Sequence, residues 1–126
     1  MFRSMLTSQC LQREIGINPE IWVDLHEIKG CRVKNTAFPG MKRSEIEEKF
    51  PGFIIPDGIT EEGWFTRDRA EKEEEGWERA GKVWQRLKAM SVLEKYQGKS
   101  VIIVTHGLFL DFLIGRLCNR KMKGGK

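Results

Sequence analysis

Cysteine is scarce in this chain, and the cysteines present form no recognisable framework. The 126 residues include three cysteines, Cys10, Cys31 and Cys118, with no C-x-x-C pair among them. An odd and widely spaced set of this kind argues against a disulfide scaffold and against a zinc-binding pattern. We therefore expect no structural disulfide, reduced thiols and a cytoplasmic protein.

Long apolar runs are also missing. The amino terminus has Arg3, but no apolar stretch long enough for a signal peptide follows it. No segment approaches the length that a helix needs to cross a bilayer. The sequence therefore excludes a membrane-spanning protein and predicts no membrane partner.

The chain has little excess charge of either sign. Its formal net charge is +4, with 40% hydrophobic and 32% charged residues, which is a composition typical of one soluble globular domain over residues 1–126. Basic residues cluster only in the tail 120–126, which we expect to be flexible, and no RNA-reading motif accompanies them. This balance favours small anions as ligands and argues against nucleic-acid binding.

The most informative feature that is present lies near the carboxyl end. Residues 101–104 read Val-Ile-Ile-Val, which predicts a short strand buried on both faces. His106 and Gly107 follow, at the sheet edge where open α/β sheets bind ligands. Gly107 allows a tight turn, and the apolar segment 108–114 would begin a helix with free N–H groups. The pattern predicts a phosphate site, and the alternative is a structural histidine held by hydrogen bonds.

Apolar spacing elsewhere predicts an alternation of helices and strands. The expected helices cover residues 3–15, 45–50 and 67–90. Alternating apolar residues predict a strand with one buried face over 21–25. Ser44 with Glu47 three residues later predicts a capping box for the second helix, and Pro51 ends that helix.

Two segments lack any sustained period. Residues 29–41 are expected to form a loop, and residues 51–66 a long ordered insertion, a feature that is often functional in a compact domain. The charged start of the third helix, residues 67–75, is expected to be a solvated face with acidic groups near the positive helix end. The large aromatic residues are expected to anchor the core and the insertion rather than to recruit a partner. They are Trp64, Phe65, Trp77 and Trp84.

Three short motifs together resemble the histidine phosphatase superfamily, which has the phosphoglycerate mutase-like fold. Residues 1–7, Met-Phe-Arg-Ser-Met-Leu-Thr, resemble the later part of its Ser-Pro-x-x-Arg-x-x-x-Thr segment. Residues 25–27, Leu-His-Glu, resemble its Leu-x-Glu segment, and residues 104–107, Val-Thr-His-Gly, match its second His-Gly motif. The resemblance implies an α/β fold, here a partial three-layer α/β/α domain with a mainly parallel sheet.

The resemblance also implies a mechanism. In the family a first histidine attacks the phosphoryl group, a second histidine and two arginines hold its oxygens, and a carboxyl group protonates the leaving oxygen. By matching position, His106 is the second histidine, Arg3 the second arginine and Glu27 the proton donor, with Gly107 beside the phosphate. These side chains suit those tasks, because guanidinium and imidazole groups donate to phosphate oxygens. The family needs no metal or organic cofactor, acts on phosphorylated small molecules or phosphoproteins, and varies its specificity in insertions such as residues 29–66.

The nucleophile of the family has no match in this sequence. The chain has two histidines, and His26 lies beside the acid in a different motif, where we expect a partly exposed histidine at a strand end. The chain begins at the equivalent of the later arginine and stops soon after the His106 helix, where the family adds another strand. We therefore expect a truncated, incomplete domain with an unpaired strand edge at residues 101–104.

Two main interpretations follow for function. The favoured one is a fragment or variant of a phosphoric monoester hydrolase that works through a phosphohistidine and is inactive as written. The other is a noncatalytic module that keeps a phosphate pocket and recruits a partner. A phosphoglycerate mutase-type phosphotransferase is a weaker third option, because nothing in the sequence identifies a device that would protect a phosphohistidine from water.

Overall fold

Four α-helices carry most of the regular structure in the computed structural model, which describes residues 1–33 and 36–120. The helices are α1 (Phe2–Ile15), α2 (Arg43–Lys49), α3 (Glu73–Ser91) and α4 (Gly107–Leu117). Two short 3-10 turns are η1 (Val23–Leu25) and η2 (Glu94–Tyr96), and two strands are β1 (Arg32–Val33) and β2 (Thr36–Ala37). The strands pair with each other in antiparallel register, and the described residues contain no parallel sheet.

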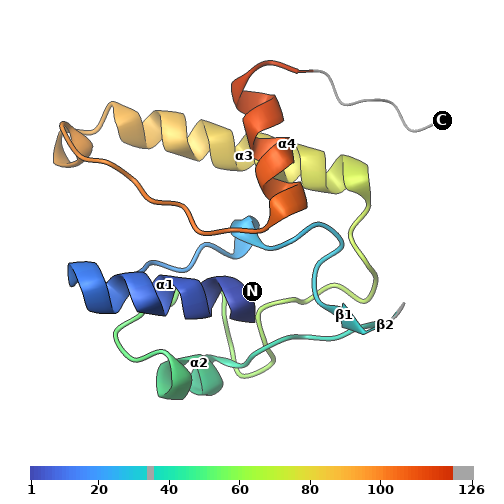
Figure 1. Cartoon of the computed structure of the whole chain (residues 1–126). Helices are drawn as coiled ribbons and strands as arrows, with labels where there is room; N and C mark the ends of the chain where they lie inside the picture. The colour runs from blue at the N-terminus through green and yellow to red at the C-terminus, as the bar shows by residue number, and fades with distance from the viewer. Residues whose placement is uncertain (34–35, 121–126) are drawn as a thin grey trace.

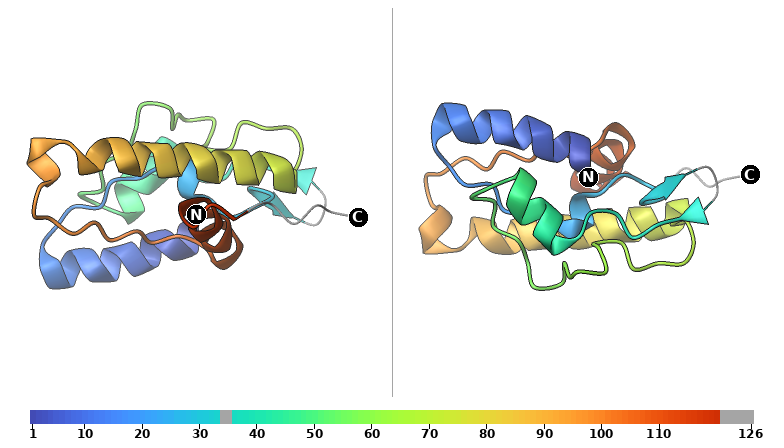
Figure 2. Two further views of the ribbon diagram at one scale, coloured as in Figure 1. Left: turned by 90° about the horizontal axis from the view of Figure 1, so that it is seen from above. Right: turned by 90° about the horizontal axis from the view of Figure 1, so that it is seen from below.

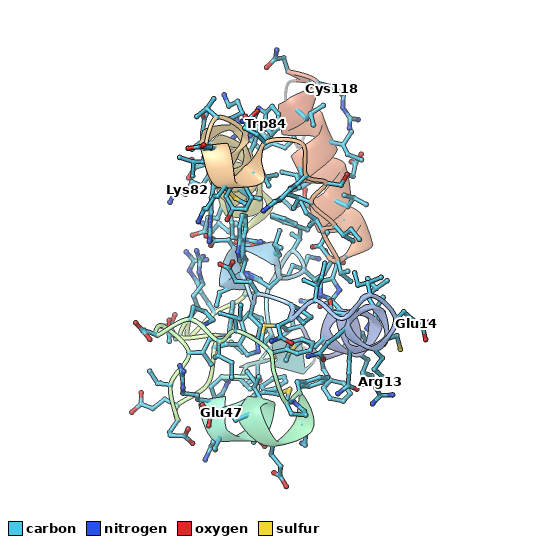
Figure 3. All side chains as sticks on the ribbon, turned by 90° about the vertical axis from the view of Figure 1, so that its left-hand side faces the viewer. Arg13, Glu14, Glu47, Lys82, Trp84 and Cys118 are labelled. Atoms are coloured by element: carbon cyan, nitrogen blue, oxygen red, sulfur yellow. The ribbon has the colours of Figure 1, made fainter. Side chains whose placement is uncertain are left out.

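The helices form two groups with irregular chain between them. Helix α4 crosses α3 and packs on it, whereas α1 and α2 lie on the other side of the molecule (Figure 1). The segment that leads into α4 runs between α3 and α1, and the first turn of α1 lies close to the start of α4 in all views (Figures 1 and 2). Figure 3 shows the same two groups from the side, with Arg13, Glu14 and Glu47 on the outside.

Two apolar clusters correspond to these groups. The first joins α1, α2 and the insertion, and its buried members are Met5, Ile21, Ile46, Phe50, Phe53, Ile59, Trp64 and Phe65. The second joins α3 and α4, and its buried members are Ile28, Ala80, Val83, Phe109 and Leu113. Leu25 and Ile28 pack in the second cluster, whereas His26 between them packs on Trp64 and Phe65 of the first, so this short stretch has the core on both sides.

The predicted first helix is confirmed. Helix α1 starts one residue earlier than expected and ends at Gly16, whose φ of 69° is the left-handed conformation that glycine adopts without strain. The Gly16 N–H donates to the Gln12 carbonyl at 2.9 Å, which closes the last turn. Its buried side chain, Met5, anchors the helix on the first cluster.

The second helix is confirmed, but it begins two residues and ends one residue earlier than predicted, and its cap is different. Lys42 precedes the first turn of α2, and its N–H donates to the Glu45 carboxylate at 2.8 Å. Ser44 lies inside that turn, where its N–H and hydroxyl donate to the Glu61 carboxylate at 2.9 and 2.7 Å. The predicted capping box of Ser44 and Glu47 is therefore wrong, because Glu61 from the insertion accepts the hydrogen bonds of Ser44. These two hydrogen bonds also lower the pKa of the Glu61 carboxyl.

The third helix begins later than predicted. Residues 67–72 are not helical, and α3 starts at Glu73. Arg67 and Arg69 both reach the Glu75 carboxylate, at 3.1 and 2.8 Å, and this clasp closes the irregular turn that precedes the helix. The hydrogen bonds from Arg69 hold the pKa of the Glu75 carboxyl well below its usual range.

Neither predicted strand forms. In residues 21–25 the hydrogen bonds close locally, because the Leu25 N–H donates to Trp22 and the His26 N–H donates to Val23, so η1 replaces a strand. Only an isolated parallel bridge between Glu20 and Ile54 remains.

Residues 101–104 are extended but unpaired. Their backbone makes no hydrogen bond with any described residue, and the side chains of Val101 and Ile102 are 52% and 63% exposed. The prediction of a strand buried on both faces is wrong here, because no described strand lies beside this segment. The backbone of this segment is unpaired within the described residues, as expected of an edge, although the segment is not a strand.

Two further predictions concern membrane-spanning helices and the carboxyl-terminal tail. No helix in residues 1–33 and 36–120 has the length and apolar character needed to cross a membrane. Arg120, the last described residue, binds the carboxylate and carbonyl of Asp111. The rest of the predicted flexible tail, residues 121–126, lies outside the described residues.

Candidate functional site

The start of α4 lies against the segment that follows η1. The Thr105 hydroxyl donates to the Leu25 carbonyl at 2.6 Å, across 80 positions of sequence. The Phe109 N–H donates to the Glu27 carboxylate at 3.1 Å, and the same oxygen accepts from the Ile28 N–H at 2.9 Å. The structure therefore brings the predicted acid and the predicted phosphate-binding turn to one place.

The Glu27 carboxylate accepts a hydrogen bond from one of the free N–H groups in the first turn of α4. His106 is the residue before the helix, so Phe109 is the third residue of the helix and its N–H is one of the unpaired donors of a helix start. A carboxylate at this end is favoured by the helix dipole. The N–H groups of Gly107 and Leu108 have no acceptor in the described part of the chain, and both residues are exposed. Two donors therefore stay free beside Glu27.

His106 lies at the edge of this turn and is partly buried. Its Nε2 atom is enclosed and has no hydrogen-bond partner within residues 1–33 and 36–120. Burial lowers the pKa of His106, the N-terminal ammonium and Arg3 lower it further, and the Glu27 carboxylate raises it. These charges act on the imidazole because they lie near it, so Arg3 and Glu27 both belong to the surroundings of His106.

Arg3 reaches this region from the first turn of α1. Its side chain is exposed and forms no hydrogen bond or ion pair with any of the residues that the structure describes. The beginning of α1 lies next to the beginning of α4 (Figure 2). The guanidinium is therefore available to an anion that binds between the two helix starts.

A groove of the molecule lies away from these residues. It runs between α1 and the extended segment that leads into α4, and its walls include Ser8, Pro19, Glu20, Ser100, Ile102 and Val104. His106, Glu27 and Arg3 are not part of its lining. The candidate site therefore lies outside this groove, at the start of α4.

His26 is buried, contrary to the prediction of a partly exposed residue. Its side chain is 7% exposed, its Nδ1 lies 2.7 Å from the Val23 carbonyl, and the Trp64 and Phe65 rings pack on it at centroid distances of 5.3 and 5.8 Å. Burial, together with the positive charge of Arg79, lowers the pKa of His26 to about 4. The aromatic residues of the insertion therefore serve as core anchors, as predicted.

Glu71 and Arg79 are the residues that sequence analysis missed. The prediction of a solvated charged face is wrong for Glu71, which is 2% exposed and accepts two hydrogen bonds from Arg79, at 2.8 and 2.7 Å. Arg79 also donates to the carbonyls of Asp24 and His26. A signal was present, because Arg79 lies on the same face of α3 as Gly76, Ala80 and Val83, the buried face of that helix.

The arrangement can hold a tetrahedral oxyanion. A guanidinium, two backbone N–H groups and an imidazole surround one surface, and a carboxyl group lies beside them. Within the described ranges, no three His, Cys, Asp or Glu side chains are grouped closely enough to hold a metal ion. The groups at this surface that can donate to an anion belong to Arg3, Gly107, Leu108 and His106, and Glu27 is the acidic residue beside them.

Comparisons with known proteins identify the family of the chain. The sequence profile of the histidine phosphatase superfamily (branch 1) matches residues 1–126. No curated protein and no solved structure matches the chain. Since the family profile spans the whole sequence and the motif residues meet at the start of α4, this chain belongs to the histidine phosphatase superfamily.

Proposed function

We propose that the chain binds the phosphoryl group of a phosphomonoester at Arg3, Gly107 and His106, with Glu27 beside the leaving oxygen. The observation that carries this proposal is the meeting of three motif segments, residues 1–7, 25–27 and 104–107, around one helix start. These segments are far apart in sequence, and each contributes one polar side chain of the type that phosphate binding requires.

Each residue has a separate task in this proposal. Arg3 supplies a planar fork of donors for two phosphate oxygens. The free N–H groups of Gly107 and Leu108 bind a third oxygen at the positive end of α4. His106 is neutral at pH 7, because its pKa is lowered, and gains a proton more readily once an anion lies beside it. Glu27 is held by two backbone N–H groups at the place from which a proton would be delivered.

Turnover requires a nucleophile that neither histidine of this chain supplies. His26 is 7% exposed, packs against the Trp64 and Phe65 rings and has its Nδ1 at the Val23 carbonyl, so it is not placed to attack a phosphoryl group at the start of α4. We therefore propose that the chain alone binds phosphomonoesters without hydrolysing them. In the proposed intact hydrolase, the attacking histidine lies on a further strand, which pairs with residues 101–104 and completes the parallel sheet of a three-layer domain.

Substrate choice belongs to the same proposal. The insertion within residues 29–66 supplies the rings on His26 and lies next to the segment that carries Glu27. It is therefore the region that would contact the remainder of a phosphorylated small molecule or phosphoprotein. A noncatalytic module that recruits a partner is the second candidate. The exposed side chains of Val101 and Ile102 favour it, whereas the buried Trp64 and Phe65 do not.

A matched pair of arginine variants tests the phosphate site. Phosphate is titrated into the chain while the ring signals of its two histidines are followed by NMR. Arg3→Ala is expected to weaken phosphate binding about tenfold or more, since a charge-assisted contact to phosphate is lost. Arg13→Ala, at the exposed far end of α1, is expected to leave binding unchanged.

Two outcomes would contradict the proposal. Equal phosphate affinity in wild type and Arg3→Ala would remove Arg3 from the site. Hydrolysis of para-nitrophenyl phosphate by the chain would overturn the proposal that it binds phosphomonoesters without hydrolysing them.

A further inference from the structure

The guanidinium of Arg79 connects three parts of the molecule. Its Nε and Nη2 atoms donate to the two oxygens of Glu71, at 2.8 and 2.7 Å. Its Nη1 atom donates to the carbonyl oxygens of Asp24 and His26, the latter at 3.0 Å. The guanidinium also lies over the Phe109 ring of α4, 4.3 Å from its centre. Arg79 of α3 therefore holds both the segment before Glu27 and the first turn of α4.

Glu71 and Arg79 form a buried ion pair, and the free-energy cost of burying their charges bears on the role of the pair. Glu71 and Arg79 are 2% and 6% exposed. Removing two charges from water is costly, and their attraction offsets this cost only with good geometry and further hydrogen bonds. Apolar side chains of similar size would fill the same space at lower cost. What such side chains would lack is a planar fork that fixes the positions of two carbonyl groups.

Those carbonyl groups belong to the residues that precede Glu27. Because the His26 carbonyl is held by Arg79, the next residue leaves this point in a fixed direction. Its carboxylate is then held by the Phe109 N–H, and the Phe109 ring packs on the same guanidinium. Glu27 is therefore fixed from the chain before it and from the helix beside it, and Arg79 contacts both supports.

We propose that Glu71 and Arg79 are positioning residues, which fix the Glu27 carboxylate with respect to His106. Glu71 orients the guanidinium, and Arg79 transmits that orientation to the main chain of residues 24–26. The consequence for phosphate chemistry rests on the function proposed above. The geometric claim itself concerns the free protein, so it can be tested without any phosphate.

The test uses the two histidines as separate probes in the absence of ligand. NMR titration gives the pKa of His106, which Glu27 raises through its charge. Glu27→Gln is expected to lower that pKa by about half a unit, the size of one charge effect over several ångströms near a surface. Arg79→Lys keeps the positive charge but loses the fork, and it is expected to lower the His106 pKa in the same direction by no more than Glu27→Gln does.

The matched control is Arg69→Lys. Arg69 also binds a carboxylate through two nitrogens, that of Glu75 at 2.9 and 2.8 Å, but it is an exposed side chain that does not contact residues 24–27. The same substitution in this pair is expected to leave the His106 pKa unchanged. This control distinguishes the loss of the Arg79 guanidinium from the loss of a guanidinium that binds a carboxylate elsewhere in the chain.

A double-variant cycle decides whether Arg79 acts through Glu27. In the Glu27→Gln background, Arg79→Lys is expected to change the His106 pKa no further. An equal change in both backgrounds, or no change in either, would overturn the proposal. If Arg79→Lys does not fold by circular dichroism, Glu71→Gln is measured in the same two backgrounds, where its own direct charge effect cancels. If Arg79→Lys acts through Glu27 but the chain does not bind phosphate, only the proposed function is rejected. If the chain binds phosphate but Arg79→Lys does not act through Glu27, only the positioning role is rejected.

Discussion

At the residue scale, two histidines of one chain have opposite surroundings. His26 packs against the Trp64 and Phe65 rings beside the Glu71 and Arg79 pair, and only 7% of it is exposed. His106 lies at the start of α4 among Arg3, Glu27 and free backbone donors. Burial lowers the pKa of both histidines. The charged neighbours of His26 include the buried Arg79 and Glu71, whereas His106 has the exposed Arg3 near it, which an anion can contact.

This difference predicts how anion binding depends on pH. Sulfate keeps its charge near neutrality, so a change in its affinity reports on the protein. Because the pKa of His106 is below its ordinary value, His106 is neutral at pH 7 and becomes positive as the pH falls through that pKa. Sulfate affinity, measured by calorimetry, is expected to rise roughly fivefold between about pH 7.5 and 5.5, since an adjacent anion raises a histidine pKa.

The control for this prediction is His106→Gln, which keeps a hydrogen-bond donor but cannot titrate. Its sulfate affinity is expected to be nearly constant over the same range. A wild-type affinity that does not change with pH would mean that His106 does not contact the anion. His26→Gln is expected to retain the full pH dependence, because His26 is enclosed.

What could be predicted at this scale depended on short motifs. Arg3, Glu27 and His106 each lie in a local pattern, and the structure brings these three residues together. Glu71 and Arg79 lie in no such pattern, because their function depends on a pairing across a helix start and on two distant carbonyl groups. The available signal was Arg79, a charged residue on the apolar face of α3, but many other charged residues in this part of the sequence made it hard to single out.

At the scale of elements, helices and strands differ in how far local sequence determines them. The hydrogen bonds of α1 and α3 lie within each helix, so apolar spacing was sufficient to predict them and only their ends shifted. A strand needs a partner. Residues 101–104 have the β-branched sequence of a strand and an extended backbone, yet no described strand accepts their hydrogen bonds.

An unpaired apolar edge of this kind predicts self-association. Ile102 is 63% exposed on the extended segment, so Ile102→Lys is expected to change the free energy of unfolding by less than about 0.5 kcal/mol. The added charge blocks pairing between edges, and the concentration-dependent rise in light scattering is expected to fall. Val92→Lys adds the same charge at a more exposed apolar residue outside the segment and is expected to leave scattering high. An equal decrease in light scattering in both variants would show that net charge, and not the segment 101–104, controls association.

At the scale of the whole molecule, the stretch from Leu25 to Ile28 joins two cores. Trp64 and Phe65 of the first cluster pack on His26, and Ile28 belongs to the second. Arg79 of α3 donates to the His26 carbonyl, and Glu71, which precedes α3, lies beside the His26 ring. Protonation of His26 would add a positive charge beside Arg79 at the junction, where the nearest compensating carboxylate oxygen is 3.9 Å from its Nε2.

Mild acid is therefore expected to destabilise the entire fold through His26. Its pKa is about 4 in the folded chain and about 6.5 when exposed, so the unfolded chain takes up a proton first as the pH falls below 6.5. Stability is fully present above that pH and decreases on acidification, by about 2 kcal/mol between pH 6.5 and 5. Urea unfolding of wild type and of His26→Gln at several pH values measures this loss. The variant is expected to lose little stability over the same range, whatever its stability at neutral pH, and parallel losses in the two proteins would show that another group controls the response to acid.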